Sequence, residues 1–196
     1  MRKILCVFVA LVGLTATLHA QIGGTPPASP TAIEIESLVP MFFYGGYHAA
    51  VAFRFDRFRV RASIINSGSY DAEPAGLVNS SPHFSRYYDN GSCGVFFDYF
   101  PFSDPLFGGL HVYAFFESHQ WRIVNNDTKQ SAAMHTFDVG PGLGYQLLFW
   151  NLLYIQPGIH FYFRSAPPID VGGEQYTIPS IDFSPVLRIG VRWSLG

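Results

Sequence analysis

Residues 136–147 read Thr-Phe-Asp-Val-Gly-Pro-Gly-Leu-Gly-Tyr-Gln-Leu, and residues 153–163 read Leu-Tyr-Ile-Gln-Pro-Gly-Ile-His-Phe-Tyr-Phe. In both stretches every second residue is bulky and apolar or a proline, and the residues between are mostly glycine, polar or aromatic. Because successive side chains of a strand point to opposite faces of a sheet, this period of two predicts two long strands with unlike faces. The short corner at Trp150 and Asn151 predicts that they pair antiparallel.

The same period recurs along the chain and predicts further strands over 47–55, 58–64, 94–100, 110–117 and 181–195. The first strand is less regular: within 32–43, Ile33 and Ile35 alternate with Glu34 and Glu36 until Pro40 interrupts. Short corners are predicted near Asp56, Asp104 and Asn151, and long polar loops over 66–92, 119–133 and 164–180. Short and long connections that alternate in this way are typical of an eight-stranded up-and-down meander.

The composition favours an all-β membrane protein. Only 13% of the 196 residues are charged, whereas 48% are hydrophobic and 17% aromatic, and a soluble domain carries about 25% charged residues. After the N-terminus, no apolar run approaches the roughly 20 residues of a membrane-spanning helix. Nineteen glycines and 14 prolines also disfavour long helices.

The N-terminus has the layout of a secretory signal peptide, with basic Arg2 and Lys3, an apolar stretch over 4–17, and Ala20 before the expected cleavage site. We therefore predict a signal peptide over 1–20, an N-terminal extension over 21–32 and a barrel domain over 33–196. Cys93 is then the single cysteine of the exported chain, so no internal disulfide is expected. A slight acidic excess gives no indication of a nucleic-acid partner.

The alternation leaves two barrels open, a soluble one with its apolar face inside and a transmembrane one with its apolar face outside. The polar faces carry small residues and arginines and no lysine, unlike a water-exposed sheet, which carries many Lys and Glu. We therefore predict an eight-stranded antiparallel transmembrane β-barrel whose apolar faces contact lipid. The interior of eight strands is only about wide enough for its own side chains, which predicts a largely plugged lumen.

Charged side chains on the inward faces are expected to pair, because a buried charge needs an opposite charge and hydrogen bonds. The fork of arginine suits this role better than lysine. The predicted lumen network comprises Arg54, Arg59, Arg61, Arg188 and Arg192 with Glu34, Glu36, Asp98, Glu117, Asp138 and Asp182. Three prolines, Pro141, Pro157 and Pro185, fall in the middle of strands on the outward face, where local bulges are expected because proline lacks an N–H.

The C-terminal stretch 188–195 matches the pattern polar, any, Gly, any, any, aromatic, any, hydrophobic, through Arg188, Gly190, Trp193 and Leu195. It resembles the insertion signal on the last strand of bacterial outer-membrane proteins, although many of those end on an aromatic residue. The chain as a whole resembles small outer-membrane barrels of the OmpA/OmpX type, within the porin-like superfamily.

This resemblance implies a monomer in the outer membrane, surrounded by lipid and lipopolysaccharide and inserted by the barrel-assembly machinery. Because the barrel pattern continues to the last residues, no counterpart of the peptidoglycan-binding domain of full-length OmpA proteins is expected. Aromatic girdles at the two membrane interfaces are expected among Tyr44, Tyr47, Tyr99, Phe149, Trp150 and Trp193.

Evidence for catalysis in the sequence is weak. The best local candidates are Glu117, Ser118 and His119, but neighbours on a strand point to opposite faces, and the His-x-Ser-Asn motif of lipid A deacylase barrels is absent. The six histidines outside the predicted signal peptide show no compact spacing of the kind that metal ligands have, so neither a metal nor another cofactor is expected. In the first long loop, His83, Arg86, Tyr87 and Tyr88 form a cluster suited to sugar or lipopolysaccharide, or simply to a solvated cap.

Two interpretations therefore remain. In the first, the protein is a non-enzymatic outer-membrane barrel whose loops contact surface molecules or whose barrel supports the envelope, with a narrow small-solute channel as a variant. In the second, it is an enzyme that modifies lipid A at its outer rim.

Overall fold

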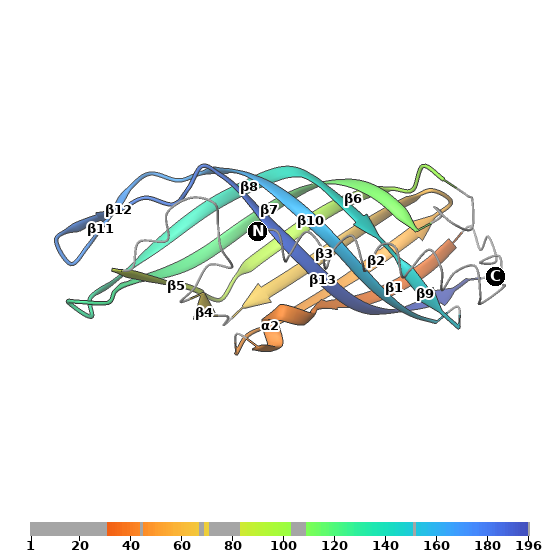
Figure 1. The fold of residues 1–196 in the computed structure, drawn as a ribbon, viewed down its shortest axis with the longest axis horizontal. Helices are drawn as coiled ribbons and strands as arrows, with labels where there is room; N and C mark the ends of the chain where they lie inside the picture. The colour runs from red at the N-terminus through yellow and green to blue at the C-terminus, as the bar shows by residue number, and fades with distance from the viewer. Residues whose placement is uncertain are drawn as a thin grey trace, which may run out of the picture.

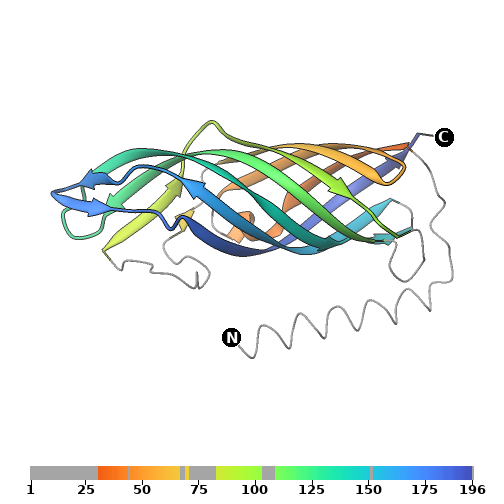
Figure 2. The ribbon, with the colours of Figure 1, turned by 90° about the horizontal axis from the view of Figure 1, so that it is seen from above.

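The computed structural model describes residues 31–43, 45–66, 69–70, 83–102, 109–150 and 152–195. The predicted signal peptide and residues 21–30 of the extension lie outside this range, as does Tyr44. The described residues form a long, tilted barrel whose strands are seen in two orthogonal views (Figures 1 and 2). No helix in these ranges is long and apolar enough to cross a membrane.

Eight antiparallel strands form the barrel, which confirms the predicted fold class. In ring order, the neighbours are β7, β6, β3, β2, β1, β13, β10 and β8, and the pairing of β7 with β8 closes the ring. Their bounds are β1 Thr31–Leu38, β2 Tyr47–Phe55, β3 Phe58–Asn66, β6 Ser92–Tyr99, β7 Leu110–Asn125, β8 Ser131–Tyr145, β10 Leu153–Ser165 and β13 Ile181–Ser194.

Smaller elements occupy the connections. The short helix α2, Val39–Phe43, follows β1, so the first predicted strand ends before Pro40. Strands β4 (Ser69–Tyr70) and β5 (Phe84–Tyr88) lie in the first long connection, β9 (Leu147–Phe149) pairs with β10, and β11 (Ile169–Val171) pairs with β12 (Glu174–Tyr176). The prediction of loops throughout 66–92 and 164–180 was therefore wrong in detail.

The prediction of a polar loop over 119–133 was also wrong. Strand β7 continues to Asn125 and β8 begins at Ser131, with unbroken pairing from Leu110↔Tyr145 to Val124↔Ser131. The alternation persists through this stretch, but the apolar residues change face. Outward-facing residues on β7 are apolar up to Phe116, whereas Ser118 begins an outward row that is mostly polar.

Between this change and the short-turn end of the barrel, apolar side chains point outward and charged ones inward. Outward residues on every strand of the ring are substantially exposed, including Ile33, Ile35, Val51, Phe53, Val60, Ile64, Val95, Phe97, Val112, Phe116, Val139, Leu143, Ile155, Phe161, Ile189 and Trp193. On the other side of the change, towards the long-loop end, the interior is filled by an apolar cluster. The cluster comprises Met41, Ile65, Tyr88, Trp121, Ile123, Met134, Val171 and Ile178.

The mid-strand prolines cause no register shift of the kind that a bulge produces, but the pairing of β8 with β10 is interrupted beside Pro141, between His160↔Gly142 and Phe163↔Val139. Pro141, Pro157 and Pro185 all lie within runs of consecutive partners, in the β7–β8 and β10–β13 pairings. Pro141 and Pro185 are exposed, whereas Pro157 is buried. Pro185 lies in the part of β13 beyond Leu38↔Arg188, where the pairing with β1 ends, and an unpaired edge tolerates proline because no ladder partner needs its N–H.

Glycines on the inner face of β8 make room for neighbouring strands and rings. A Cβ atom at Gly140 would overlap the backbone carbonyl oxygen of Phe161 on β10, and one at Gly142 would overlap the ring of Tyr113 on β7. Protein interiors have no free space for such atoms. The first conflict involves backbone, and the second involves a side chain that can be replaced.

We therefore predict that Gly142→Ala lowers the free energy of unfolding by about 1–3 kcal/mol, as overpacking does. Adding Tyr113→Leu removes the obstructing ring. The double variant should therefore lose less free energy of unfolding than the sum of the losses in the two single variants. Gly140→Ala combined with Tyr113→Leu should show no such recovery. Urea unfolding in detergent measures all five variants, and additive losses in both pairs would contradict this packing.

Candidate functional site in the barrel lumen

Asp98 on β6 is the centre of the most buried polar cluster. It lies opposite Arg59 on β3 in the strand register, and its two carboxylate oxygens accept hydrogen bonds from Nε and Nη2 of Arg59 at 3.2 and 3.1 Å. The same oxygens accept bonds from Nε and Nη2 of Arg61 at 2.8 and 2.9 Å. Residues 59 and 61 are two apart on one strand and thus point to the same face, which lets one carboxylate bind both guanidinium groups.

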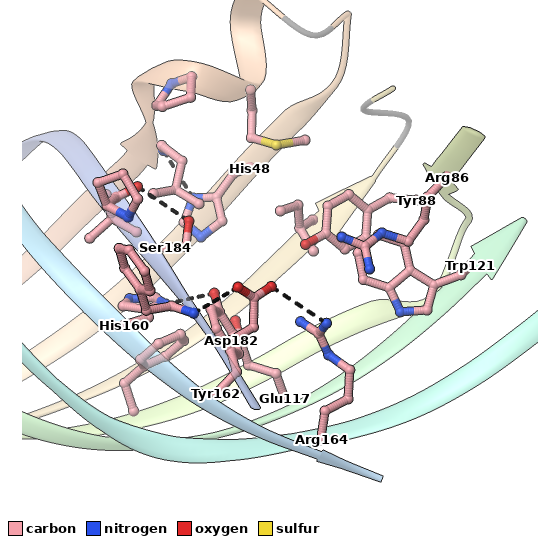
Figure 3. A pocket seen from close by; sticks show the side chains of 18 residues that line it. His48, Arg86, Tyr88, Glu117, Trp121, His160, Tyr162, Arg164, Asp182 and Ser184 are labelled. Carbon is pink, nitrogen blue, oxygen red and sulfur yellow. Dashed lines mark hydrogen bonds and ion pairs between the residues drawn. The ribbon is translucent and has the colours of Figure 1, made fainter. Parts of the chain in front are cut away.

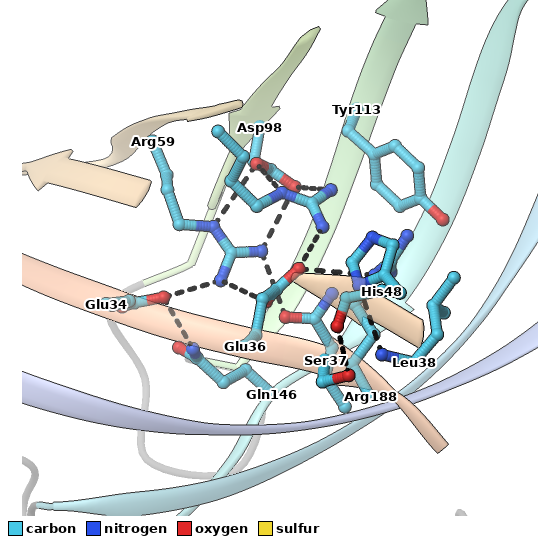
Figure 4. Close-up of polar contacts among 12 residues, drawn as sticks. Glu34, Glu36, Ser37, Leu38, His48, Arg59, Asp98, Tyr113, Gln146 and Arg188 are labelled. Carbon is cyan, nitrogen blue, oxygen red and sulfur yellow. Dashed lines mark hydrogen bonds and ion pairs between the residues drawn. The ribbon is translucent and has the colours of Figure 1, made fainter. Parts of the chain in front are cut away.

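Strand β1 supplies the next two carboxylates (Figure 4). Glu34 accepts a 2.7 Å bond from Arg59 Nη1, and Glu36 accepts a 2.7 Å bond from Arg61 Nη1. Arg188 on β13 approaches Glu36 with its Nε at 3.2 Å. Glu34, Glu36, Arg59, Arg61 and Asp98 are at most 2% exposed, so the network lies across the interior of the barrel.

Neutral side chains complete this network. Gln156 accepts a 2.9 Å bond from Arg59, Tyr154 donates one of 2.8 Å to Glu36, and Gln146 donates one of 3.1 Å to Glu34. Arg54 donates to Gln146 at 3.0 Å and lies over the ring of Phe100, with its Cζ 3.7 Å from the ring centroid. The guanidinium groups of Arg54, Arg59 and Arg61 are therefore met by acceptors or by an aromatic face, which buried charges require.

A second polar cluster lies nearer the long-loop end. Asp138 on β8 is bound by Nδ1 of His119 at 3.1 Å and by Nε of Arg164 at 2.9 Å. Nη1 of Arg164 is 3.8 Å from Asp182 on β13. Glu117 is 8% exposed, and its Oε2 lies 3.9 Å from Nε2 of His119.

The predicted lumen residues thus fall into two groups rather than one. Glu34, Glu36, Arg59, Arg61, Asp98 and Arg188 form the central network, with Arg54 and Arg192 at its margin; Arg192 Nε is 3.9 Å from Glu34. Glu117, Asp138 and Asp182 lie with Arg164, which the sequence analysis placed in a loop. The signal that would have found Arg164 is its phase, because it continues the inward series of His160 and Tyr162.

Among the residues that match the assembly pattern, Arg188 and Gly190 lie over the lumen, where Gly190 leaves space for the ring of Tyr154. Trp193 and Leu195 are exposed. The catalytic candidates do not converge: Glu117 and His119 point inward, whereas Ser118 bonds the exposed His135 at 2.8 Å. In the described ranges, no three acidic, histidine or cysteine side chains are placed to hold a metal ion.

The aromatic and basic residues of the first long connection do not form one surface. Arg86 and Tyr88 point inward against Trp121, with the Tyr88 and Trp121 ring centroids 4.0 Å apart and Arg86 Cζ 4.5 Å from the Trp121 ring. His83 instead lies outside the barrel and contacts Asp127 at 2.7 Å. The hydrogen bond that protonated His83 donates to Asp127 raises the pKa of His83 above its ordinary value of 6.5.

The sequence and the fold of the chain can be compared with those of known proteins. No family model and no curated protein sequence matches it. Three solved structures are similar: the N-terminal β-barrel domain of Pseudomonas aeruginosa OprF (16% identity, 83% of this chain, 97% of that chain, TM-score 0.41), Neisserial surface protein A (11%, 85%, 97%, 0.41) and a major outer membrane protein from Thermus thermophilus (16%, 83%, 98%, 0.40).

We predict that Arg61→Ala, and likewise Arg59→Ala, lowers the free energy of unfolding by about 3–5 kcal/mol, because each strands buried carboxylates. The matched control is Arg57→Ala, since the side chain of Arg57 is exposed and donates to the backbone oxygen of Pro101 at 3.2 Å, outside the lumen network. Its effect should stay within about 0.5 kcal/mol. Urea midpoints and heat-modifiable gel mobility measure both, and equal midpoints for the lumen and control variants would count against the network.

We also predict a pH effect at the exposed His83–Asp127 pair. Because its pKa is raised, protonated His83 stabilises the folded pair at pH values below 6.5, and this contribution disappears as the pH rises through the higher pKa of the folded state. NMR titration should place the midpoint of His83 above 6.5. Asp127→Asn should bring it back towards the ordinary value, and an unchanged midpoint would refute the pairing.

Proposed function

We propose that the protein is a non-enzymatic integral protein of the bacterial outer membrane, with a polar, largely plugged lumen. The observation that carries this proposal is the inverted polarity of the barrel. Arg59 and Glu34, both fully buried, point inward, whereas Ile35, Phe53 and Phe97 on the same sheet are 46%, 46% and 59% exposed. In water such an exposed apolar surface is costly, at about 25 cal/mol per Å², but in hydrocarbon it is matched by its surroundings.

The ring closure supports a membrane location. Every backbone group at bilayer depth must find a partner inside the protein, which a closed barrel provides. The ends of the apolar surface also fit this location. Aromatic rings line the short-turn end, where Phe55, Phe58 and Tyr99 stand in sequence with centroid distances of 5.7 and 5.3 Å, and such rings favour a membrane interface.

The lumen network supports a plug rather than a pore. Glu34, Arg59, Arg61, Asp98 and Gln156 come from four different strands, and each is at most 2% exposed. Their bonds cross the interior between β1, β3, β6 and β10, so a passing solute would have to break several charge-assisted bonds at once. Stabilising the barrel, and thereby the presentation of its outer end, is the role that this interior fits best.

We further infer that the long-loop end faces outward, where it meets lipopolysaccharide and surface partners. The short-turn end would then face the periplasm, and the C-terminal pattern from Arg188 to Leu195 would be read by the barrel-assembly machinery during insertion. Eight strands close the ring within one chain, so a monomer suffices.

We predict that the purified protein, folded into planar bilayers, shows no discrete ion conductance. The double variant Glu34→Ala with Arg59→Ala removes one charge of each sign and two long side chains from the interior, and it should produce measurable current. Arg57→Ala serves as the surface control and should remain silent.

Channels of equal size in the wild type and in the double variant would overturn the plug. A folded monomer that needs no detergent would overturn the membrane location itself. The two parts of the proposal therefore fail separately.

A further inference from the structure

A cavity of about 280 Å³ lies between the central charge network and the apolar cluster at the long-loop end. Its wall includes residues of α2, β2, β5, β7, β10 and β13, among them Glu117, Trp121, Tyr162, Arg164, Asp182 and Ser184. Figure 3 shows Glu117, Asp182 and Arg164 pointing into the same space. Asp182 and Ser184 are half-buried, so solvent reaches the cavity from the β13 side.

The cavity exists because strand β1 is short. Its pairing with β13 ends at Leu38↔Arg188, and α2 occupies the place where β1 would have continued beside residues 181–187 of β13. Met41 on α2 is 1% exposed and lines the cavity. At this place the wall is therefore formed by a side chain of α2 and not by a paired strand. The result is a chamber that has a polar floor and an opening in the barrel wall.

Two charged groups in the wall have unused hydrogen-bonding capacity. Oε2 of Glu117 and Nη1 of Arg164 are buried without a hydrogen-bond partner among the described residues. Glu117 is 8% exposed and Arg164 9%. A buried polar atom without a partner is costly, so something other than the described side chains is expected to meet them.

The charges in the wall have both signs, which indicates the type of ligand. Glu117 needs a donor, and Arg164 needs an acceptor. A hydroxyl group can act as donor and as acceptor. A molecule with several hydroxyls can therefore satisfy Glu117 and Arg164 without bringing a net charge into the cavity. Aromatic side chains of Phe96, Trp121 and Tyr162 supply apolar wall between the polar groups, as in small-molecule sites generally.

We propose that this chamber binds a neutral polyhydroxylated molecule of about monosaccharide size. The volume lies at the lower limit of about 300 Å³ for ligand pockets, which excludes a longer saccharide from lying wholly inside. The same chemistry is offered by a free sugar and by the terminal sugar of a membrane glycolipid. This inference goes beyond the proposed function and is tested in detergent, independently of conductance.

The experiment is calorimetric titration of the folded full chain with glucose, galactose and N-acetylglucosamine, in a detergent whose headgroup is not a sugar. A ligand of this size is expected to bind with a dissociation constant on the order of 1 mM. Trp121 provides a second readout, as fluorescence in a Trp150→Phe, Trp193→Phe background. A parallel titration with glycolipid vesicles shows whether a membrane-borne sugar binds better than the free one.

Glu117→Gln should weaken binding at least tenfold, while the urea midpoint stays the same or rises, because an uncompensated buried charge is removed. A purely structural Glu117 would lower the midpoint instead. Glu174→Gln, on the exposed hairpin of β11 and β12, is the matched control and should bind as the wild type does. Ser184→Phe fills the chamber without changing any charge, and it should abolish binding even if Glu117→Gln does not fold.

The proposal is overturned if none of the three sugars and no glycolipid gives saturable binding. It is equally overturned if Ser184→Phe binds as tightly as the wild type. Loss of binding in Ser184→Phe together with unchanged binding in Glu174→Gln supports it.

Discussion

The pairing of Asp98 with two guanidinium groups is the interaction on which the rest of the barrel depends. Arg59 and Arg61 can stay charged in the interior only because one carboxylate binds both and because Glu34 and Glu36 reach them from the neighbouring side of the ring. Without these bonds, the desolvation cost of each buried charge would be uncompensated. Since the partners come from β1, β3 and β6, the network also fixes how these strands are arranged.

The chain has one alternating pattern but two relations to its surroundings. Up to Phe116 on β7 the apolar residues face outward, and from Trp121 onward they face inward around Met134 and Ile123. The strands continue through this change without a break in register. The barrel therefore combines a part with an apolar outer face and a charged interior with a part whose interior is apolar.

Much of the architecture could be predicted from the sequence because a period of two survives in every strand of the ring. The regions that could not be predicted are those where this signal changes meaning. Residues 119–133 contain Arg122 and several polar residues, and they were interpreted as a loop, although Trp121 and Ile123 keep the period. Helix α2 is too short for a helical period, and Pro40 pointed only to an interruption.

For the site, the inward phase of each strand identified which charged residues enter the lumen, but not which of them meet. The tilt of the strands decides that. Asp98 lies opposite Arg59, whereas Glu117 and Asp138 face each other across β7 and β8, and so the carboxylates divide into two clusters. Arg164 belongs to the second cluster because β10 extends to Ser165, beyond the regular alternation that ends at Phe163. The neighbouring Ala166 and Pro167 are typical of a loop, so the sequence did not indicate that Arg164 faces inward.

The boundary between β1 and β13 has a consequence for how the ring is made. It joins strands from opposite ends of the described chain through only seven partnered positions, Ala32↔Ser194 to Leu38↔Arg188. Contacts that span so much sequence are the slowest to form, so this boundary is expected to be the last seam to close during assembly.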